Sequence, residues 1–150
     1  MNRRRFVAGV VTMLAVPKMA FAGGPTIAVV CNPASGINSL SRAQLDAIFR
    51  LKTQQFPGGG RVTPINLPID HVGRQEFDRV VLGLDPDEVE RFWIDSKIRS
   101  GTGAPRHLPA PALARYIASE STAVGYLPLD EIGSGLRQVA LVRDGRVVPS

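Results

Sequence analysis

Two hydrophobic patterns alternate along the chain: short continuous apolar runs, and apolar positions three and four residues apart. Thr26–Val30 is a continuous apolar and β-branched run, which predicts a strand covered on both faces. An apolar helical face begins at Leu45, and Ser41 with Gln44 has the S-x-x-Q spacing of a capping box that starts a helix. The sequence therefore predicts a strand, a polar loop and a helix within residues 26–52.

The same patterns recur in the rest of the chain. They predict strands over Arg61–Leu67 and Thr122–Leu127, a hairpin over Gln138–Val142 and Arg146–Val148, and helices over Val72–Leu84, from Asp85 to near Lys97, and from Pro111. Because strands alternate with helices, the expected fold class is α/β, with a mixed sheet flanked by helices.

The first 22 residues have the pattern of an export signal. Arg3–Arg5 is a basic region, Phe6–Val16 is an apolar stretch too short to span a bilayer, and Ala20–Ala22 is an A-x-A cleavage site. Arg3-Arg4-x-Phe6 also fits a twin-arginine motif, with Asn2 where Ser or Thr is usual, so Sec and twin-arginine export both remain open. We expect cleavage near Ala22, a periplasmic location, and one domain over residues 23–150.

Charge and cysteine content narrow the function classes. The chain has 18 Lys and Arg against 13 Asp and Glu, and four of the 18 lie in the leader, so residues 23–150 are near neutral. This balance argues against a nucleic-acid partner or an anionic membrane surface. Cys31 is the only cysteine, so no internal disulfide forms, and its place after an apolar strand predicts a buried, inert thiol.

Three segments have residues suited to binding an anion. Ser35, Gly36 and Ser39 form a loop that leads into the first helix, where free backbone N–H groups attract anions; the alternative is that the loop only turns and caps. The other two candidates are His71, Gly73 and Arg74 at the start of the second helix, and the glycine-rich run Ser100, Gly101 and Thr102.

Each of these candidates has a structural alternative. Arg74 is either an anion ligand or a solvated helix charge, and Ser100–Thr102 is either a site or a connecting loop. Tyr126, which follows Gly125, is most simply an aromatic residue of a strand that packs on the core.

The sequence gives no pattern for catalysis. His71 and His107 are the only histidines, no G-x-S-x-G motif occurs, and no His, Cys and carboxylate cluster has metal-ligand spacing. We therefore expect no enzyme activity, no catalytic residue, no metal and no cofactor.

Several of these motifs together resemble a known family. They are the Thr26–Val30 strand, an Asn32-Pro33 turn, the run S-L-S-x-x-Q-L-x-x-I-F followed by Lys52, and a later Val124-Gly125-Tyr126. The chain resembles the substrate-binding protein of phosphate ABC transporters over roughly residues 26–142. The resemblance implies a single periplasmic-binding-protein-like lobe, a phosphate-like oxyanion ligand and an ABC transporter permease or another inner-membrane protein as partner. It also implies that Tyr126 borders the ligand site, because this segment lies near the cleft in the family.

The main anion motif of that family is altered in this chain. His71-Val72-Gly73 stands where the family has Ser-Gly-Thr, and Leu67 stands where it has an arginine, so several strong charge-assisted bonds to phosphate are lost. Two hypotheses follow: a solute-binding domain for phosphate or another small oxyanion, and a degenerate protein-interaction or regulatory module. A homodimer that rebuilds a cleft between two copies would combine them.

Overall fold

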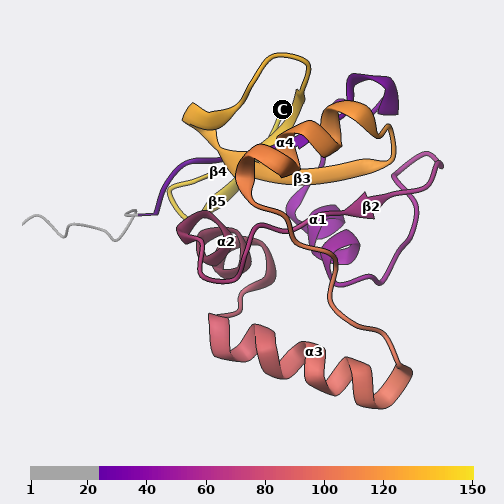
Figure 1. Ribbon diagram of the computed structural model, residues 1–150, viewed down its shortest axis with the longest axis vertical. Helices are drawn as coiled ribbons and strands as arrows, with labels where there is room; N and C mark the ends of the chain where they lie inside the picture. Colours follow the sequence, from indigo (N-terminus) through magenta and orange to yellow (C-terminus); the bar gives the residue numbers. More distant parts are fainter. Residues whose placement is uncertain (1–23) are drawn as a thin grey trace, which may run out of the picture.

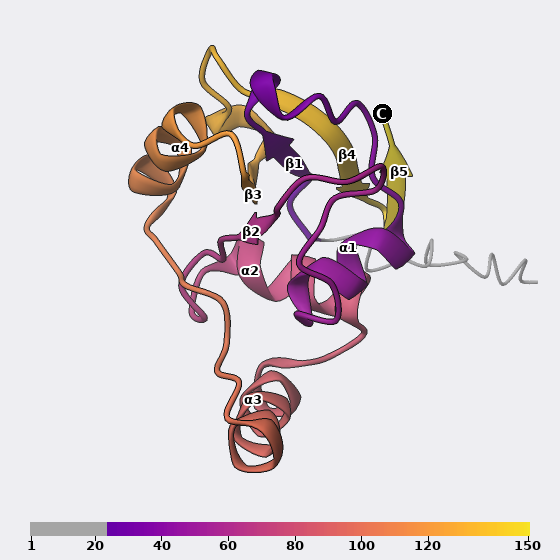
Figure 2. The same ribbon diagram turned by 90° about the vertical axis from the view of Figure 1, so that its right-hand side faces the viewer.

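The computed structural model describes residues 24–150, which form one five-stranded sheet with helices around it (Figures 1 and 2). The strand order is β2-β3-β1-β4-β5, in which β1 is antiparallel to β3 and β4 while β2 is parallel to β3. The predicted α/β fold with a mixed sheet is confirmed. The strands are β1 Ile27–Cys31, β2 Thr63–Pro64, β3 Ala123–Pro128, β4 Arg137–Arg143 and β5 Arg146–Pro149.

Strand β1 is the centre of the sheet. All five of its residues have 0% exposure, because β3 and β4 flank the strand and other segments cover both faces. This explains the continuous apolar run in the sequence. Burial also raises the pKa of the Cys31 thiol to about 12, so the thiol stays protonated and inert, as predicted.

The helices begin where the sequence places their caps. In α1 (Arg42–Phe49) Ser41 Oγ accepts from Gln44 N at 3.2 Å, and Gln44 Oε1 accepts from Ser41 N at 2.8 Å, which confirms the capping box. A second capping box joins Asp85 and Glu88 at the start of α3. The remaining helices are α2 Val72–Phe77, continued by a π-helical segment Asp78–Leu82, and α4 Ala110–Ser119.

Two predicted boundaries differ from the structure. The strand expected over Arg61–Leu67 pairs with β3 only at Thr63–Pro64, because Leu67 has other backbone partners: its N–H donates to Tyr126 Oη and its carbonyl accepts from Arg74. Helix α3 extends to Ser100 rather than ending near Lys97, because the left-handed residue that terminates it is Gly101, with φ of 73°. The predicted leader, residues 1–22, lies outside the described residues.

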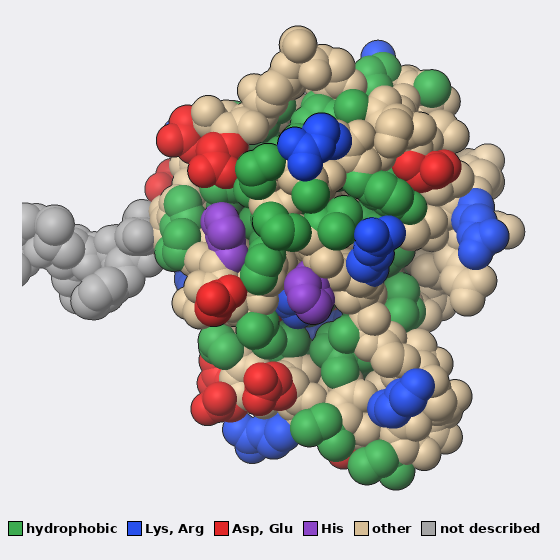
Figure 3. Space-filling model, viewed as in Figure 1, with side chains coloured by type: hydrophobic (Ala, Val, Ile, Leu, Met, Phe, Trp, Pro, Cys, Tyr) green, Lys and Arg blue, Asp and Glu red, His purple; other side chains and the backbone are tan. Residues whose placement is uncertain are grey.

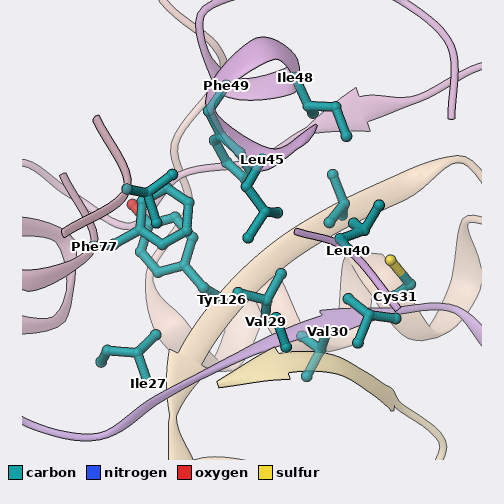
Figure 4. Packing of buried hydrophobic residues seen from close by; sticks show 14 of the residues in the cluster. Ile27, Val29, Val30, Cys31, Leu40, Leu45, Ile48, Phe49, Phe77 and Tyr126 are labelled. Atoms are coloured by element: carbon teal, nitrogen blue, oxygen red, sulfur yellow. The ribbon is translucent and has the colours of Figure 1, made fainter. Parts of the chain in front are cut away.

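Three aromatic rings form the centre of the core between the sheet and the helices α1 and α2 (Figure 4). Phe77 stacks on Tyr126 with ring centroids 3.9 Å apart, and Phe49 packs edge-on against both. These contacts fix α1 and α2 to the same strand, β3, which carries Tyr126.

Helix α3 (Pro86–Ser100) projects from this body on two extended connections (Figures 1 and 2). Of its side chains only Val89 and Trp93 are buried, whereas Ile94 and Ile98 are 59% and 77% exposed. Within residues 24–150, neither α3 nor any other helix is long and apolar enough to cross a bilayer.

Gly125 explains the glycine of the Val124-Gly125-Tyr126 motif. A Cβ at this position would lie 2.8 Å from Ile117 Cδ1, 3.0 Å from Leu113 Cδ2 and 3.2 Å from the Ile65 carbonyl oxygen. Helix α4, which carries Ile117 and Leu113, therefore packs directly on the backbone of β3.

We predict that Gly125→Ala forces α4 away from the sheet and lowers the free energy of unfolding by about 1–3 kcal/mol. Chemical denaturation would measure this loss. Gly133→Ala is the matched control, because no atom lies within 4 Å of the added Cβ, and its expected change is within about 0.5 kcal/mol. Equal effects of the two substitutions would contradict the close approach of α4.

Candidate functional site

The start of α2 is shaped by His71 and Gly73. The Nδ1 atom of His71 accepts a hydrogen bond from Gly73 N at 2.9 Å, so the imidazole caps the helix. A Cβ on Gly73 would lie 3.1 Å from His71 Nδ1 and 3.2 Å from Ile27 Cδ1. Glycine at this position therefore lets α2 lie close to β1, and both residues have a structural role.

Arg74 is buried inside the protein. Its side chain is 6% exposed, Nε donates to Asp78 Oδ2 at 2.8 Å, and Nη1 donates to the Leu67 carbonyl at 2.9 Å. The alternative of a solvated helix charge is therefore wrong. The i, i+4 spacing of Arg74 and Asp78 on one helix was a readable signal for this ion pair.

Asp78 is buried as deeply as its partner, with a side chain that is 4% exposed. Burial raises the pKa of the Asp78 carboxyl, and the Arg74 guanidinium opposes that rise only in part. Oδ1 of Asp78 has no hydrogen-bond partner among the described residues. Burying both charges costs desolvation free energy, which the attraction between them offsets. Loss of either residue would leave the other charge buried without a partner.

Tyr126 supports the Arg74–Asp78 pair indirectly, through the backbone of Leu67. Its hydroxyl donates to Asn66 Oδ1 at 2.9 Å and accepts from Leu67 N at 3.3 Å, and the side chain is fully buried. Burial raises the pKa of Tyr126 well above its ordinary value. The residue thereby holds the Leu67 backbone whose carbonyl receives Arg74, and it presents no exposed surface to a solute.

Above Arg74 lies a hollow of about 870 Å³ between the body and α3. Figure 3 shows this furrow, with hydrophobic side chains on both sides and acidic and histidine side chains next to them. Arg74 contributes to its wall although most of the side chain is buried. The other lining residues are Pro68, Ile69, Asp70, Val89, Glu90, Trp93, Ile94, Ala104, Pro105 and His107.

The other predicted candidates lie elsewhere. Asn32 ties the loop before α1 to the end of α4, because its Nδ2 donates to the carbonyls of Ile117 and Ala118. In that loop Ser35 Oγ accepts from Ile37 N, while Gly36, with φ of 74°, ends a short 3-10 helix. Ser39 is exposed in the same loop.

The glycine-rich run begins at Ser100, the last residue of α3, at the far end of the projecting helix (Figure 1). Ser100 Oγ donates to Ser96 O at 2.9 Å, and Gly101 is the left-handed residue that ends the helix. Thr102 is exposed next to them. The three predicted anion segments therefore do not converge, and only that of Arg74 lines the hollow.

Sequence reasoning missed several residues of the hollow. Glu90 and Trp93 fall within the helix predicted from Asp85, and the sequence indicated no binding role for them or for His107. Their common position arises because α3 and residues 68–70 line the same hollow from two sides, which no local pattern predicts. Within residues 24–150, no three His, Cys, Asp or Glu side chains come together as a set of metal ligands.

Comparisons with known proteins then relate this architecture to solved structures. A scan of family models found no match, and neither did a search of curated proteins. Solved structures do match. The ABC-type phosphate transport receptor of Vibrio cholerae has a TM-score of 0.61 and 16% identity, over 76% of this chain and 46% of the receptor.

The chain has the fold of part of a phosphate-transport receptor. A phosphate-bound ABC transporter substrate-binding protein from Clostridium perfringens matches with a TM-score of 0.56 and 17% identity, and PstS from Borrelia burgdorferi with 0.54 and 15%. The match covers 44% and 46% of these two proteins, so the chain spans under half the length of the receptors it resembles. The resemblance read from the sequence is confirmed as a likeness of fold.

We predict that Arg74→Met lowers the free energy of unfolding by about 3–5 kcal/mol, because it leaves Asp78 buried without its counter-ion. The double change Arg74→Met and Asp78→Leu should recover much of that loss, since it removes both charges. Thermal or urea unfolding of the two variants would measure both effects.

Arg99→Met is the matched control for that experiment. Arg99 and Asp95 have the same i, i+4 spacing, but their side chains are 80% and 65% exposed and 3.7 Å apart. Its expected cost is below about 1 kcal/mol. If Arg74→Met cost no more than Arg99→Met, the buried pair would not have the role assigned to it.

Proposed function

We propose that this chain is an exported, non-catalytic solute-binding domain that holds phosphate or another small oxyanion in the hollow above Arg74. The observation that carries the proposal is a buried guanidinium in the wall of an open hollow, in a chain with the fold of phosphate-transport receptors. Nε and Nη1 of Arg74 are occupied by the protein, and no described residue takes Nη2, so one nitrogen can donate to an oxyanion.

The same geometry predicts weak affinity for free phosphate. Asp78 offsets the charge of Arg74, and His71 uses Nδ1 to cap α2. A single lobe also leaves a bound ion open to water on the side that a second lobe would cover. A strongly hydrated anion gains little where few donors replace its water.

Export and transport complete the proposal. Residues 1–22 would direct the chain to the periplasm and be cleaved near Ala22, leaving residues 23–150 as the working domain. There the domain would present its solute to an ABC transporter permease or another inner-membrane protein. The fold shared with transport receptors supports this assignment.

One observation favours the second candidate, a protein-interaction or regulatory module that no longer binds phosphate. Helix α3 projects from the body and exposes Ile94 and Ile98 on successive turns. Exposed apolar side chains on a projecting helix are suited to docking against a membrane protein, a sensor or a second copy of this chain.

We predict that millimolar phosphate, arsenate, sulfate or another small oxyanion raises the melting temperature of the purified protein. Because the expected affinity is weak, a millimolar ligand reaches about ten times its Kd at most, which adds about 1.4 kcal/mol and shifts the melting temperature by about 5 °C for a domain of this size. The shift should shrink in Arg74→Lys, which keeps a positive charge beside Asp78 but loses the guanidinium donors.

Two variants separate loss of the site from loss of folding. Ala104→Trp places a large side chain in the hollow at an exposed position, and Ala118→Trp adds the same bulk on an exposed position of α4. Loss of the shift only in Ala104→Trp supports the hollow as the site. If no oxyanion stabilises the wild-type protein, solute binding fails and the interaction module becomes the function to test.

The mode of export can be tested separately. If the leader is a twin-arginine signal, changing Arg3 and Arg4 to Lys should stop export, because that pathway requires the arginine pair. Fractionation of cells expressing the full chain would show the product retained in the cytoplasm. Undiminished export of the double variant would instead assign the leader to the Sec pathway.

A further inference from the structure

The hollow beside α3 is larger and more apolar than an inorganic ion requires. Its volume of about 870 Å³ lies in the range of pockets that take small organic molecules, roughly 300–1,000 Å³. Val89, Trp93 and Ile94 face it from α3, and Ile69 and Pro105 from the body. A bare oxyanion at Arg74 would leave these side chains exposed to water, whereas an organic body would cover them.

Arg74 provides the place for one anionic group. Its guanidinium is fixed by Asp78 and the Leu67 carbonyl, so the position of the remaining donor, Nη2, is set before a ligand arrives. One donor on an ion pair that is already neutral suits a single carboxylate or phosphate-ester oxygen better than a free dianion.

The rim of the hollow carries the opposite charge. Asp70 and Glu90 are exposed carboxylates that line the same hollow as Arg74. Since Asp78 offsets Arg74, these two carboxylates make the lining net negative. Such a lining repels a free dianion and attracts an ammonium group, and burial of neighbouring apolar surface strengthens both effects.

We propose that the hollow binds a zwitterionic organic molecule with an aromatic or comparably apolar body. Its oxyanion group lies at Arg74, its ammonium group at Asp70 and Glu90, and its body against Trp93 and Pro105. This inference rests on the proposed function, because it keeps the same hollow and the same anchoring arginine. It changes the ligand from an inorganic ion to an organic molecule that carries an oxyanion.

Four probes test each part of this assignment on the purified protein. L-Phenylalanine has all three parts, 3-phenylpropanoate lacks the ammonium group, phenethylamine lacks the carboxylate, and inorganic phosphate lacks both the ammonium group and the body. Calorimetric titration should rank L-phenylalanine first, by about tenfold or more over each half-ligand, with phosphate weakest.

Neutralising the two rim carboxylates, Asp70 and Glu90, tests whether they bind the ammonium group. Asp70→Asn with Glu90→Gln should weaken L-phenylalanine and phenethylamine by about tenfold and leave 3-phenylpropanoate unchanged or tighter, because only the ammonium partner is lost. Asp95→Asn with Asp144→Asn removes the same charge from positions that do not line the hollow, and should change none of the affinities. Both double variants alter exposed residues, so folding should be kept.

The outcomes distinguish this inference from the function on which it rests. If phosphate binds at Arg74 more tightly than the three organic probes, the inference is overturned and the oxyanion-binding function stands. If 3-phenylpropanoate matches or exceeds L-phenylalanine, the assignment of the acidic rim is wrong. If none of the four probes binds, both the inference and the hollow as a solute site fail.

Discussion

The buried ion pair between Arg74 and Asp78 is the interaction on which the structure around the hollow depends. It fixes α2 to the segment before it, because the same guanidinium also holds the Leu67 carbonyl. Removing two charges from water is costly, and this cost is recovered only while both partners and the carbonyl stay in place. The floor of the hollow is therefore rigid as a direct result of the charge pairing beneath it.

Two core residues, Tyr126 and Phe77, support the ion pair from the side of the sheet. Tyr126 holds the N–H of Leu67, so both backbone groups of one residue are fixed by side chains from different elements. The Tyr126 ring stacks on Phe77, which precedes Asp78 on the same helix. A hydrophobic stack and a polar pair thus position the same helix turn, and a change in one is transmitted to the other. Figure 4 shows how Tyr126 and Phe77 face one another in the core.

Much of the fold could be predicted from sequence because its signals are local. The continuous apolar run of β1 and the capping box of Ser41 and Gln44 specify their elements within a few residues, and both agree with the structure. The interior position of Arg74 could not be predicted in the same way. Whether a helix arginine faces solvent or the protein interior depends on the Leu67 carbonyl and on Asp78, and the backbone route of residues 64–70 decides where that carbonyl points.

The candidate site shows the same limit. Glycine and serine motifs correctly indicated loops and caps, but Ser35 and Ser100 use their hydroxyl groups locally, as most such residues do. The hollow lies instead between α3 and the body, and the sequence of α3 contains no binding motif. Residues that line a space between two elements carry no pattern of their own, so the site becomes visible only once both elements are placed.

The projecting position of α3 also has a consequence for the stability of the molecule. The helix buries only Val89 and Trp93, and Gly83 and Gly101 bound it with left-handed backbone conformations. Its amide protons should therefore exchange with solvent through a local opening that leaves the sheet intact, at a free energy well below that of global unfolding. Because residues of α3 form one wall of the hollow, this local opening would also disrupt the hollow. A solute bound there would therefore slow amide exchange throughout α3 and leave the exchange of β1 unchanged.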